Sequence, residues 1–155
     1  MSQAVESLLS TELAAVDQFL ELLGEEQRVL QEGPAERLRS LGEEKLALVD
    51  ALNRLESERE QLLAGTPGPS NRARMESWLA GKTATPACRA QWARLMERAG
   101  EARRLHTLNA EMVNSLLRRT GEAIDILMQR KKEAALYGSD GQATEVTGSR
   151  IVDSA

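Results

Sequence analysis

The chain has 155 residues, of which 41% are apolar and 28% are charged, a mix typical of a soluble protein. It is rich in Ala, Leu, Glu and Arg and holds two Trp, one Tyr and one Phe, so we expect an all-helical fold with an aliphatic core. No apolar run approaches the roughly 18 residues that cross a bilayer. The N-terminus lacks the basic and apolar blocks of a secretory signal peptide, so we expect a cytoplasmic protein without direct membrane insertion.

The sequence offers no equipment for catalysis or cofactor binding. It contains one cysteine, Cys88, and one histidine, His106, which lie 18 positions apart on one expected helix. At about 1.5 Å per residue this separation is roughly 27 Å, which excludes a thiol–imidazole pair within the chain. A metal site built from several His and Cys ligands is excluded as well. We therefore expect no enzyme, no metal centre and no cofactor.

The net charge of −4 is divided unevenly along the chain. Residues 1–65 carry 14 acidic and 6 basic side chains, whereas residues 66–155 carry 10 acidic and 14 basic ones. An acidic helical hairpin that packs against a basic third helix accounts for this division. A nucleic-acid site is the alternative. It is disfavoured because acidic residues interrupt the basic ones and no aromatic stacking platform accompanies them.

The first two helices are predicted to form a hairpin. Residues 3–31 place apolar side chains on a 4-3-4-3 spacing, which keeps one stripe facing a partner helix, and Gly33-Pro34 then breaks the helix. Residues 34–64 carry a second stripe on which Lys45 and Arg59 also fall. Each of these two side chains either extends its charge to water along the rim or fixes the register by pairing with a carboxylate. The sequence leaves both alternatives open.

A short helix and a long one follow the hairpin. Ser70 ends a Gly/Pro-rich loop and is expected to cap a short helix at residues 71–80, whose Trp78 covers one end of the bundle. A third long helix is expected at residues 88–136. The predicted architecture is an antiparallel bundle of three long helices with coiled-coil character, with the short helix in the second connection.

The predicted bundle forms one domain over residues 1–137. Residues 138–155 are polar and rich in Gly and Ser, and we expect them to form a flexible C-terminal tail.

Apolar residues on two sides of the third long helix indicate a binding surface. One set is expected to face the bundle and comprises Val113, Leu116, Ala123 and Leu127. Leu117, Ile124 and Met128 form a second stripe on a different side. A helix that is apolar on two sides must be covered on two sides. The cover is either the protein itself, through its hairpin or a second copy, or an amphipathic helix of another protein.

Tyr137, the single tyrosine, lies at the junction of the third helix and the tail. It either packs against the helix end or anchors a partner.

Four stretches of the sequence are informative when taken together. They are Glu43-Glu44-Lys45 followed by Leu48, Leu52, Leu55, Glu56 and Arg59; Leu108-Asn109; Ala123-Ile124 with Leu127; and Leu136-Tyr137-Gly138-Ser139-Asp140-Gly141-Gln142. This series resembles the FlgN family of flagellar type III export chaperones, and its last stretch, at this distance after a three-helix pattern, is the most specific. One departure is Met112-Val113, which stands where members often carry Asn-Gly.

The resemblance implies a chaperone that holds the hook–filament junction proteins FlgK and FlgL in the cytoplasm before export. Such chaperones cover the C-terminal amphipathic helices of these cargoes, prevent their premature association and deliver them to the export gate protein FlhA. Carried over to this sequence, cargo binding falls on Met112, Val113, Leu116, Leu117, Ala123, Ile124, Leu127 and Met128. Export-gate binding falls on Leu136, Tyr137, Gly138, Asp140 and Gly141.

A structural coiled-coil scaffold or self-oligomerising subunit without an export role is the alternative function. It predicts a stable obligate oligomer that buries the second apolar stripe, whereas the chaperone is expected to be a monomer or a weak homodimer.

Overall fold

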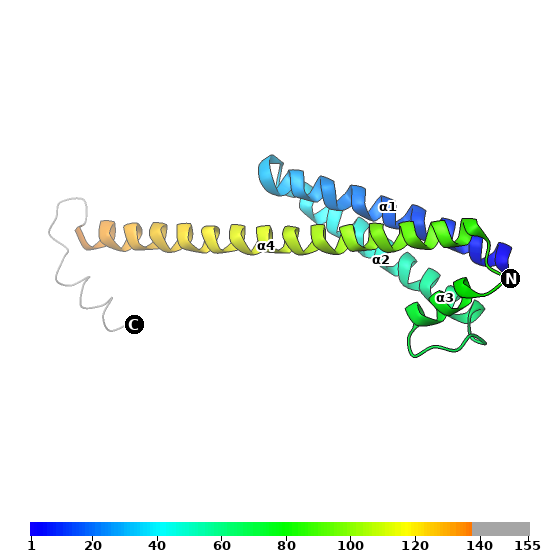
Figure 1. Cartoon of the computed structure of the whole chain (residues 1–155). Coiled ribbons are helices and arrows are strands. Elements are labelled where there is room, and N and C mark those ends of the chain that lie inside the picture. The colour runs from blue at the N-terminus through cyan, green and yellow to red at the C-terminus, as the bar shows by residue number, and fades with distance from the viewer. Residues whose placement is uncertain (138–155) are drawn as a thin grey trace. The chain divides into compact units, whose positions relative to one another are not determined.

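The computed structural model describes residues 1–137, which form four α-helices and no strand, and the predicted all-helical class is confirmed (Figure 1). The helices are α1 (Ser2–Glu32), α2 (Glu36–Leu62), α3 (Asn71–Ala80) and α4 (Pro86–Tyr137). Each helix begins and ends within two residues of its expected position. The three-helix bundle with coiled-coil character stays a prediction, and the predicted flexible tail, 138–155, lies outside the described residues.

By its internal contacts the chain divides into two units, Met1–Glu111 and Met112–Ala155. The first contains α1, α2, α3 and the start of α4, and the boundary falls inside α4. The predicted single domain over residues 1–137 stays a prediction. The long helices differ in length, because α1 and α2 have 31 and 27 residues whereas α4 has 52. Two shorter helices cannot cover the longer one from end to end.

The helix ends follow local chemistry. A Cβ atom at Gly33, just past the end of α1, would lie 2.5 Å from the Cα of Val29, so only glycine fits this close approach. At the start of α3, the hydroxyl of Ser70 accepts a hydrogen bond from the backbone N–H of Ala73 at 3.2 Å. This bond satisfies one of the free N–H groups of the first helical turn, as expected for a capping serine.

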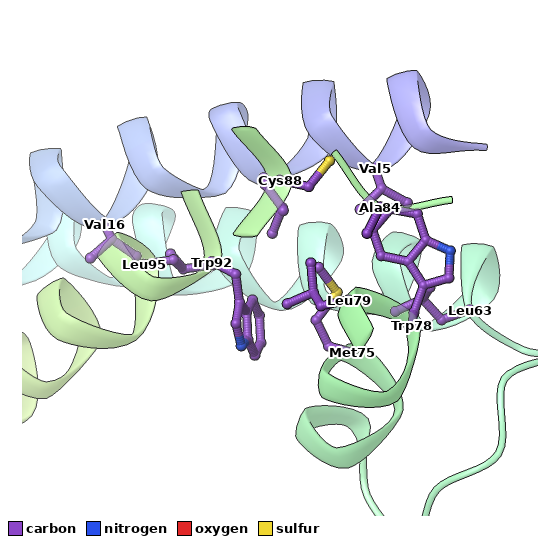
Figure 2. Close-up of a cluster of buried hydrophobic side chains, with 11 residues drawn as sticks. Val5, Val16, Leu63, Met75, Trp78, Leu79, Ala84, Cys88, Trp92 and Leu95 are labelled. Atoms are coloured by element: carbon purple, nitrogen blue, oxygen red, sulfur yellow. The ribbon is translucent and has the colours of Figure 1, made fainter. Parts of the chain in front are cut away.

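The apolar core of the first unit gathers side chains from α1, α3 and α4 and from Leu63, the residue that follows α2. Figure 2 shows Trp78 of α3 beside Val5 of α1 and Ala84, with Met75 and Leu79 of α3 on the side of Trp92 of α4. The cluster comprises Val5, Leu9, Val16, Leu63, Met75, Trp78, Leu79, Ala84, Cys88, Trp92 and Leu95. Each large side chain buried here contributes about 1.5–3 kcal/mol. Cys88 is fully buried in this core.

A buried ion pair joins α1 to α2 and lies against α4. The guanidinium of Arg59 donates a hydrogen bond from Nε to the Glu12 Oε1 at 2.8 Å. The two side chains are only 7% and 6% exposed. On its other side the guanidinium carbon of Arg59 lies 5.0 Å from the centre of the Trp92 ring, within the range of a cation–π interaction. One residue from each long helix therefore meets at this polar layer.

A second polar layer repeats this arrangement further along the same three helices. The Lys45 ammonium donates to both carboxylate oxygens of Glu26, at 3.1 and 3.0 Å. Asn109 on α4 donates through Nδ2 to Glu26 Oε1 and to the carbonyl oxygen of Leu23, each at 2.9 Å. Asn109 is 1% exposed, so these bonds form in the interior.

The two polar layers fix the register of α1 against α2. They lie fourteen residues apart on both helices, from Glu12 to Glu26 and, in the opposite direction, from Arg59 to Lys45. Four helical turns bring a residue back to nearly the same face, so the layers stack on one side of an antiparallel pair. Of the two alternatives for Lys45 and Arg59, the structure therefore shows pairing with a carboxylate. Any sliding by one turn would leave three buried charges, Glu12, Arg59 and Glu26, and the partly buried Lys45 without partners.

We predict that Arg59→Met lowers the free energy of unfolding by about 3 kcal/mol at neutral pH, because it leaves the Glu12 carboxylate buried without its partner. The double variant Glu12→Leu/Arg59→Met should recover most of this loss, since both charges are then gone. Urea denaturation of the three proteins measures the difference. The exposed pair of Arg72 and Glu76 supplies the control, in which Arg72→Ala costs less than about 1 kcal/mol. A double variant as unstable as Arg59→Met would contradict this account.

The pKa of Glu12 gives a second prediction. Burial raises the pKa of this carboxyl, and the hydrogen bond and charge of Arg59 oppose the rise only in part. The folded state therefore holds the proton more tightly than the unfolded state does. The stability from this group is fully present below the unfolded pKa and is lost as the pH rises through the raised folded pKa. Relative to Glu12→Gln, the wild-type protein should lose unfolding free energy across that interval, as followed by urea denaturation at a series of pH values. An opposite slope would show that Arg59 outweighs burial.

Candidate protein-binding surface

The part of α4 that belongs to the second unit presents apolar side chains to solvent. Seven large ones are between 37% and 66% exposed. They are Val113, Leu116, Leu117, Ile124, Ile126, Leu127 and Met128. At 100° per residue Ile126 lies nearly opposite Ile124, so the apolar surface extends around the helix instead of forming one stripe. In a protein–protein complex such a surface is a candidate contact. Here the seven residues are called the apolar sleeve.

The predicted cargo-binding residues all lie in or beside the apolar sleeve. Six of the eight belong to it, Ala123 is exposed between its members, and Met112 is partly buried at its start. Ile126 was not among the predicted binding residues, although it is as exposed as the others. Its position opposite Ile124 breaks the two-stripe pattern, and that irregularity is the sequence signal for a helix with no single buried face.

One expectation about this region is wrong. Val113, Leu116, Ala123 and Leu127 were expected to face the bundle, but all four are exposed. The reason is the length of α1, whose Glu26 meets Asn109 and which then ends at Glu32, only six residues later. Helix α4 continues from Asn109 to Tyr137, a further 28 residues. A repeating stripe continues past the point at which its partner helix ends.

The structure describes only two of the five predicted gate-binding residues. Leu136 is partly exposed near the end of α4, and Tyr137 is the last residue of that helix. Gly138, Asp140 and Gly141 lie outside the described residues.

A separate apolar groove lies within the first unit and was not predicted. It has a volume of about 750 Å³ and runs between α2 and α4, with α1 behind it. Leu46 and Val49 on α2 border it and are 67% and 38% exposed. Across from them α4 contributes only the small side chains of Ala99 and Ala102 to the apolar lining. These residues define what is called here the α2–α4 groove.

The α2–α4 groove was missed because the predicted stripe of α2 runs through Lys45 and Leu48. Leu46 and Val49 lie beside that stripe and received no role. Two large apolar residues three positions apart, off the stripe of a helix, are a detectable signal for a second apolar face.

The described residues also bear on metal binding and on membrane spans. Within residues 1–137, no group of three or more His, Cys, Asp or Glu side chains is placed to hold a metal ion. None of the described helices is long and apolar enough to span a membrane.

Comparison with protein families identifies the family of the chain. A family model with the description FlgN protein matches residues 1–145. The chain belongs to the FlgN family. FlgN proteins are flagellar export chaperones, and this is the general role of the chain. The match extends over both units and includes the apolar sleeve and the α2–α4 groove. No curated protein and no solved structure was found to match the chain.

As a member of the FlgN family whose sleeve is separate from its core, the protein should tolerate charge on the sleeve. We predict that Leu117→Glu and Ile124→Glu each change the unfolding free energy by less than about 0.5 kcal/mol, because neither side chain is buried. Leu95→Glu, which places a charge in the core, should unfold the first unit. Circular dichroism with urea denaturation compares the three. A large loss of stability in Ile124→Glu would show that the sleeve is part of a buried core.

Proposed function

We propose that this FlgN-family chain binds the C-terminal amphipathic helices of the hook–filament junction proteins FlgK and FlgL on its apolar sleeve. The observation that supports the proposal is the exposure of seven large apolar side chains on one stretch of helix inside the family match. An amphipathic helix from a cargo buries its own apolar face and the sleeve at once. The cargo helices are then unable to associate with each other before export.

Burial of the apolar side chains of the sleeve contributes free energy comparable to the cost of forming such a complex. Complete burial of one large apolar side chain contributes about 1.5–3 kcal/mol, and the sleeve residues, already about half covered, gain roughly half of that each. Association itself costs about 4–15 kcal/mol in lost translational and rotational freedom. Contacts on one face of the sleeve, together with the matching face of the cargo helix, contribute free energy of the same order as this cost.

Two features of the sleeve favour binding to more than one cargo. Met112 and Met128 stand at its two ends, and their flexible thioether side chains adapt to neighbours of different shape. Gly121 lies in the middle of the sleeve, and nothing within 4 Å would meet a Cβ atom there. A cargo helix can approach the backbone closely at this point. One surface of this kind accommodates both FlgK and FlgL.

Delivery to the export gate requires a second contact. We assign it to Leu136, Tyr137, Gly138, Asp140 and Gly141, which follow the sleeve directly in the sequence. Tyrosine provides a large amphipathic anchor and is enriched at binding hot spots, and Tyr137 is the single tyrosine of the chain. Binding of FlhA here leaves the sleeve free to hold cargo, and the whole cycle takes place in the cytoplasm.

The proposal is tested by calorimetric titration of the full chain with the C-terminal helical segments of FlgK and FlgL. We predict saturable binding to the wild-type protein. Leu117→Glu and Ile124→Glu should each weaken it at least tenfold, because a buried charge opposes the contact. Leu108→Glu, which changes an exposed leucine of α4 outside the sleeve, should bind as the wild type does.

Absence of binding to both segments would reject the chaperone assignment to these cargoes. If the protein were at the same time an obligate oligomer with a buried sleeve, a structural coiled-coil scaffold would be the better account.

A further inference from the structure

The residues that line the α2–α4 groove follow a fixed order along it. Trp92 of α4 lies against Arg59 of α2, and Asn109 of α4 shares the Glu26 carboxylate with Lys45 of α2. Helix α4 therefore runs antiparallel to α2 across the groove. The first lining residue of α4 lies opposite the last lining residue of α2, and the whole lining belongs to the first unit.

The α2–α4 groove is apolar at one end and charged at the other. The apolar end is lined by Val16, Phe19, Leu52 and Ala99. The exposed side chains of Leu46 and Val49 continue this apolar lining along α2. All ionisable lining residues lie away from the apolar end, and they are Arg39, Glu43, Lys45, Arg103 and His106. A ligand with an apolar chain and a charged head matches this polarity.

Ion pairs within the charged end leave one lining cation without a partner. Lys45 is paired with Glu26 and Arg39 with Glu43, whereas Arg103 forms no ion pair within residues 1–137. The exposed imidazole of His106 follows Arg103 by three residues, so the two side chains lie on the same side of α4. A ligand head of one negative charge therefore finds its complement here.

The charged neighbours that do not line the groove leave this balance unchanged. Within the stretches of α1, α2 and α4 that form the groove, they are Asp17, Glu44, Asp50, Glu101 and Arg104. Asp17 and Glu101 contact Arg98, and Glu44 contacts Arg37. Asp50 and Arg104 form no ion pair with a described residue and have opposite signs.

The size of the groove fits a single thin chain. Its lining on α2 extends from Arg39 to Leu52, which at about 1.5 Å per residue gives a length of roughly 20 Å. A helix of this length and about 10 Å across has roughly twice the volume of the groove, which is about 750 Å³. A single extended acyl chain is much thinner and lies inside the groove along its length. The groove therefore favours one acyl chain over a helix or a lipid with two chains.

We infer that the α2–α4 groove binds the free anion of a long-chain fatty acid. The acyl chain lies along Leu46 and Val49 and ends near Leu52, where its burial in apolar surroundings drives binding. The carboxylate lies beside Arg103 and His106, which donate hydrogen bonds to it. The inference does not rest on the proposed function, because no residue of the apolar sleeve lines the groove.

Calorimetric titration of the full chain with decanoate, below the concentration at which it forms micelles, tests the site. We predict saturable binding of one decanoate per chain. Decyltrimethylammonium, which has a chain of comparable length and the opposite head charge, should bind at least tenfold more weakly. Dodecanoate should bind roughly fourfold more tightly than decanoate, because its two further methylene groups are each about half covered in an open groove.

Variants of the full chain separate the apolar and the charged parts of the site. Leu46→Glu should weaken decanoate binding at least tenfold, whereas Leu108→Glu, which changes an exposed leucine outside the groove, should bind as the wild type does. Arg103→Gln should weaken it about threefold, as expected for an exposed ion pair. Arg104→Gln is the matched control, because this neighbouring arginine does not line the groove, and it should have no effect. Ile124→Glu in the sleeve should also have no effect.

Several results would overturn the inference. They are the absence of saturable decanoate binding, equal affinity for decanoate and decyltrimethylammonium, and a Leu46→Glu variant that binds decanoate as the wild type does. Loss of decanoate binding in Ile124→Glu would assign the acyl chain to the sleeve. Val49→Glu provides a second groove variant in case Leu46→Glu does not fold by circular dichroism.

Two further titrations distinguish the fatty acid from other occupants. Displacement of decanoate by the FlgK or FlgL segments would assign the groove to a helix and overturn the inference. Binding to anionic phospholipid vesicles that is lost in Leu46→Glu would assign it to a membrane lipid. Decanoate binding in a protein that binds neither FlgK nor FlgL would reject the proposed cargo and leave the fatty-acid site standing.

Discussion

The buried charges of Glu12 and Arg59, with Trp92 against them, are the constraint on which the first unit depends. An aliphatic helix pair made of repeated leucines can slide by a turn and still bury apolar surface, whereas an ion pair 2.8 Å long has one acceptable position. The second layer, of Glu26, Lys45 and Asn109, restricts the register of the helices in the same way four turns further along. Two such layers fix both the register of the hairpin and the place of α4 against α1, and therefore also the shape of the α2–α4 groove.

Because the helices differ in length, the residues that form the core are not the residues that form the apolar sleeve. Helix α1 ends soon after the second polar layer, and α4 continues with side chains that contribute nothing to the core. The first unit holds its own apolar cluster, while the sleeve keeps its apolar area available for a partner. Exposed apolar side chains on α4 therefore coexist with a core that does not depend on them.

The sequence predicted the four helices closely, since each is bounded by Gly, Pro or a capping serine whose effect is local. It also located most residues of the apolar sleeve, because an apolar pattern on two sides of a helix is visible without coordinates. The sequence could not predict which side chains are buried or paired. Lys45 and Arg59 had two acceptable environments, and Glu12 and Glu26 were not recognised as their partners, since pairs 47 and 19 residues apart depend on how the hairpin packs. Val113 and Leu127 were assigned to the bundle because a stripe contains no information on where its partner helix ends.

Asn109 has a consequence for the order in which parts of the protein open. Its buried amide ties α4 to the carbonyl oxygen of Leu23 and to Glu26, two residues before the first unit ends at Glu111. From Ala110 to Leu136 no side chain of α4 is buried, so we expect this stretch to open at lower free energy than the first unit. A protease added to the free protein is therefore expected to cut α4 beyond Asn109 before it cuts the first unit.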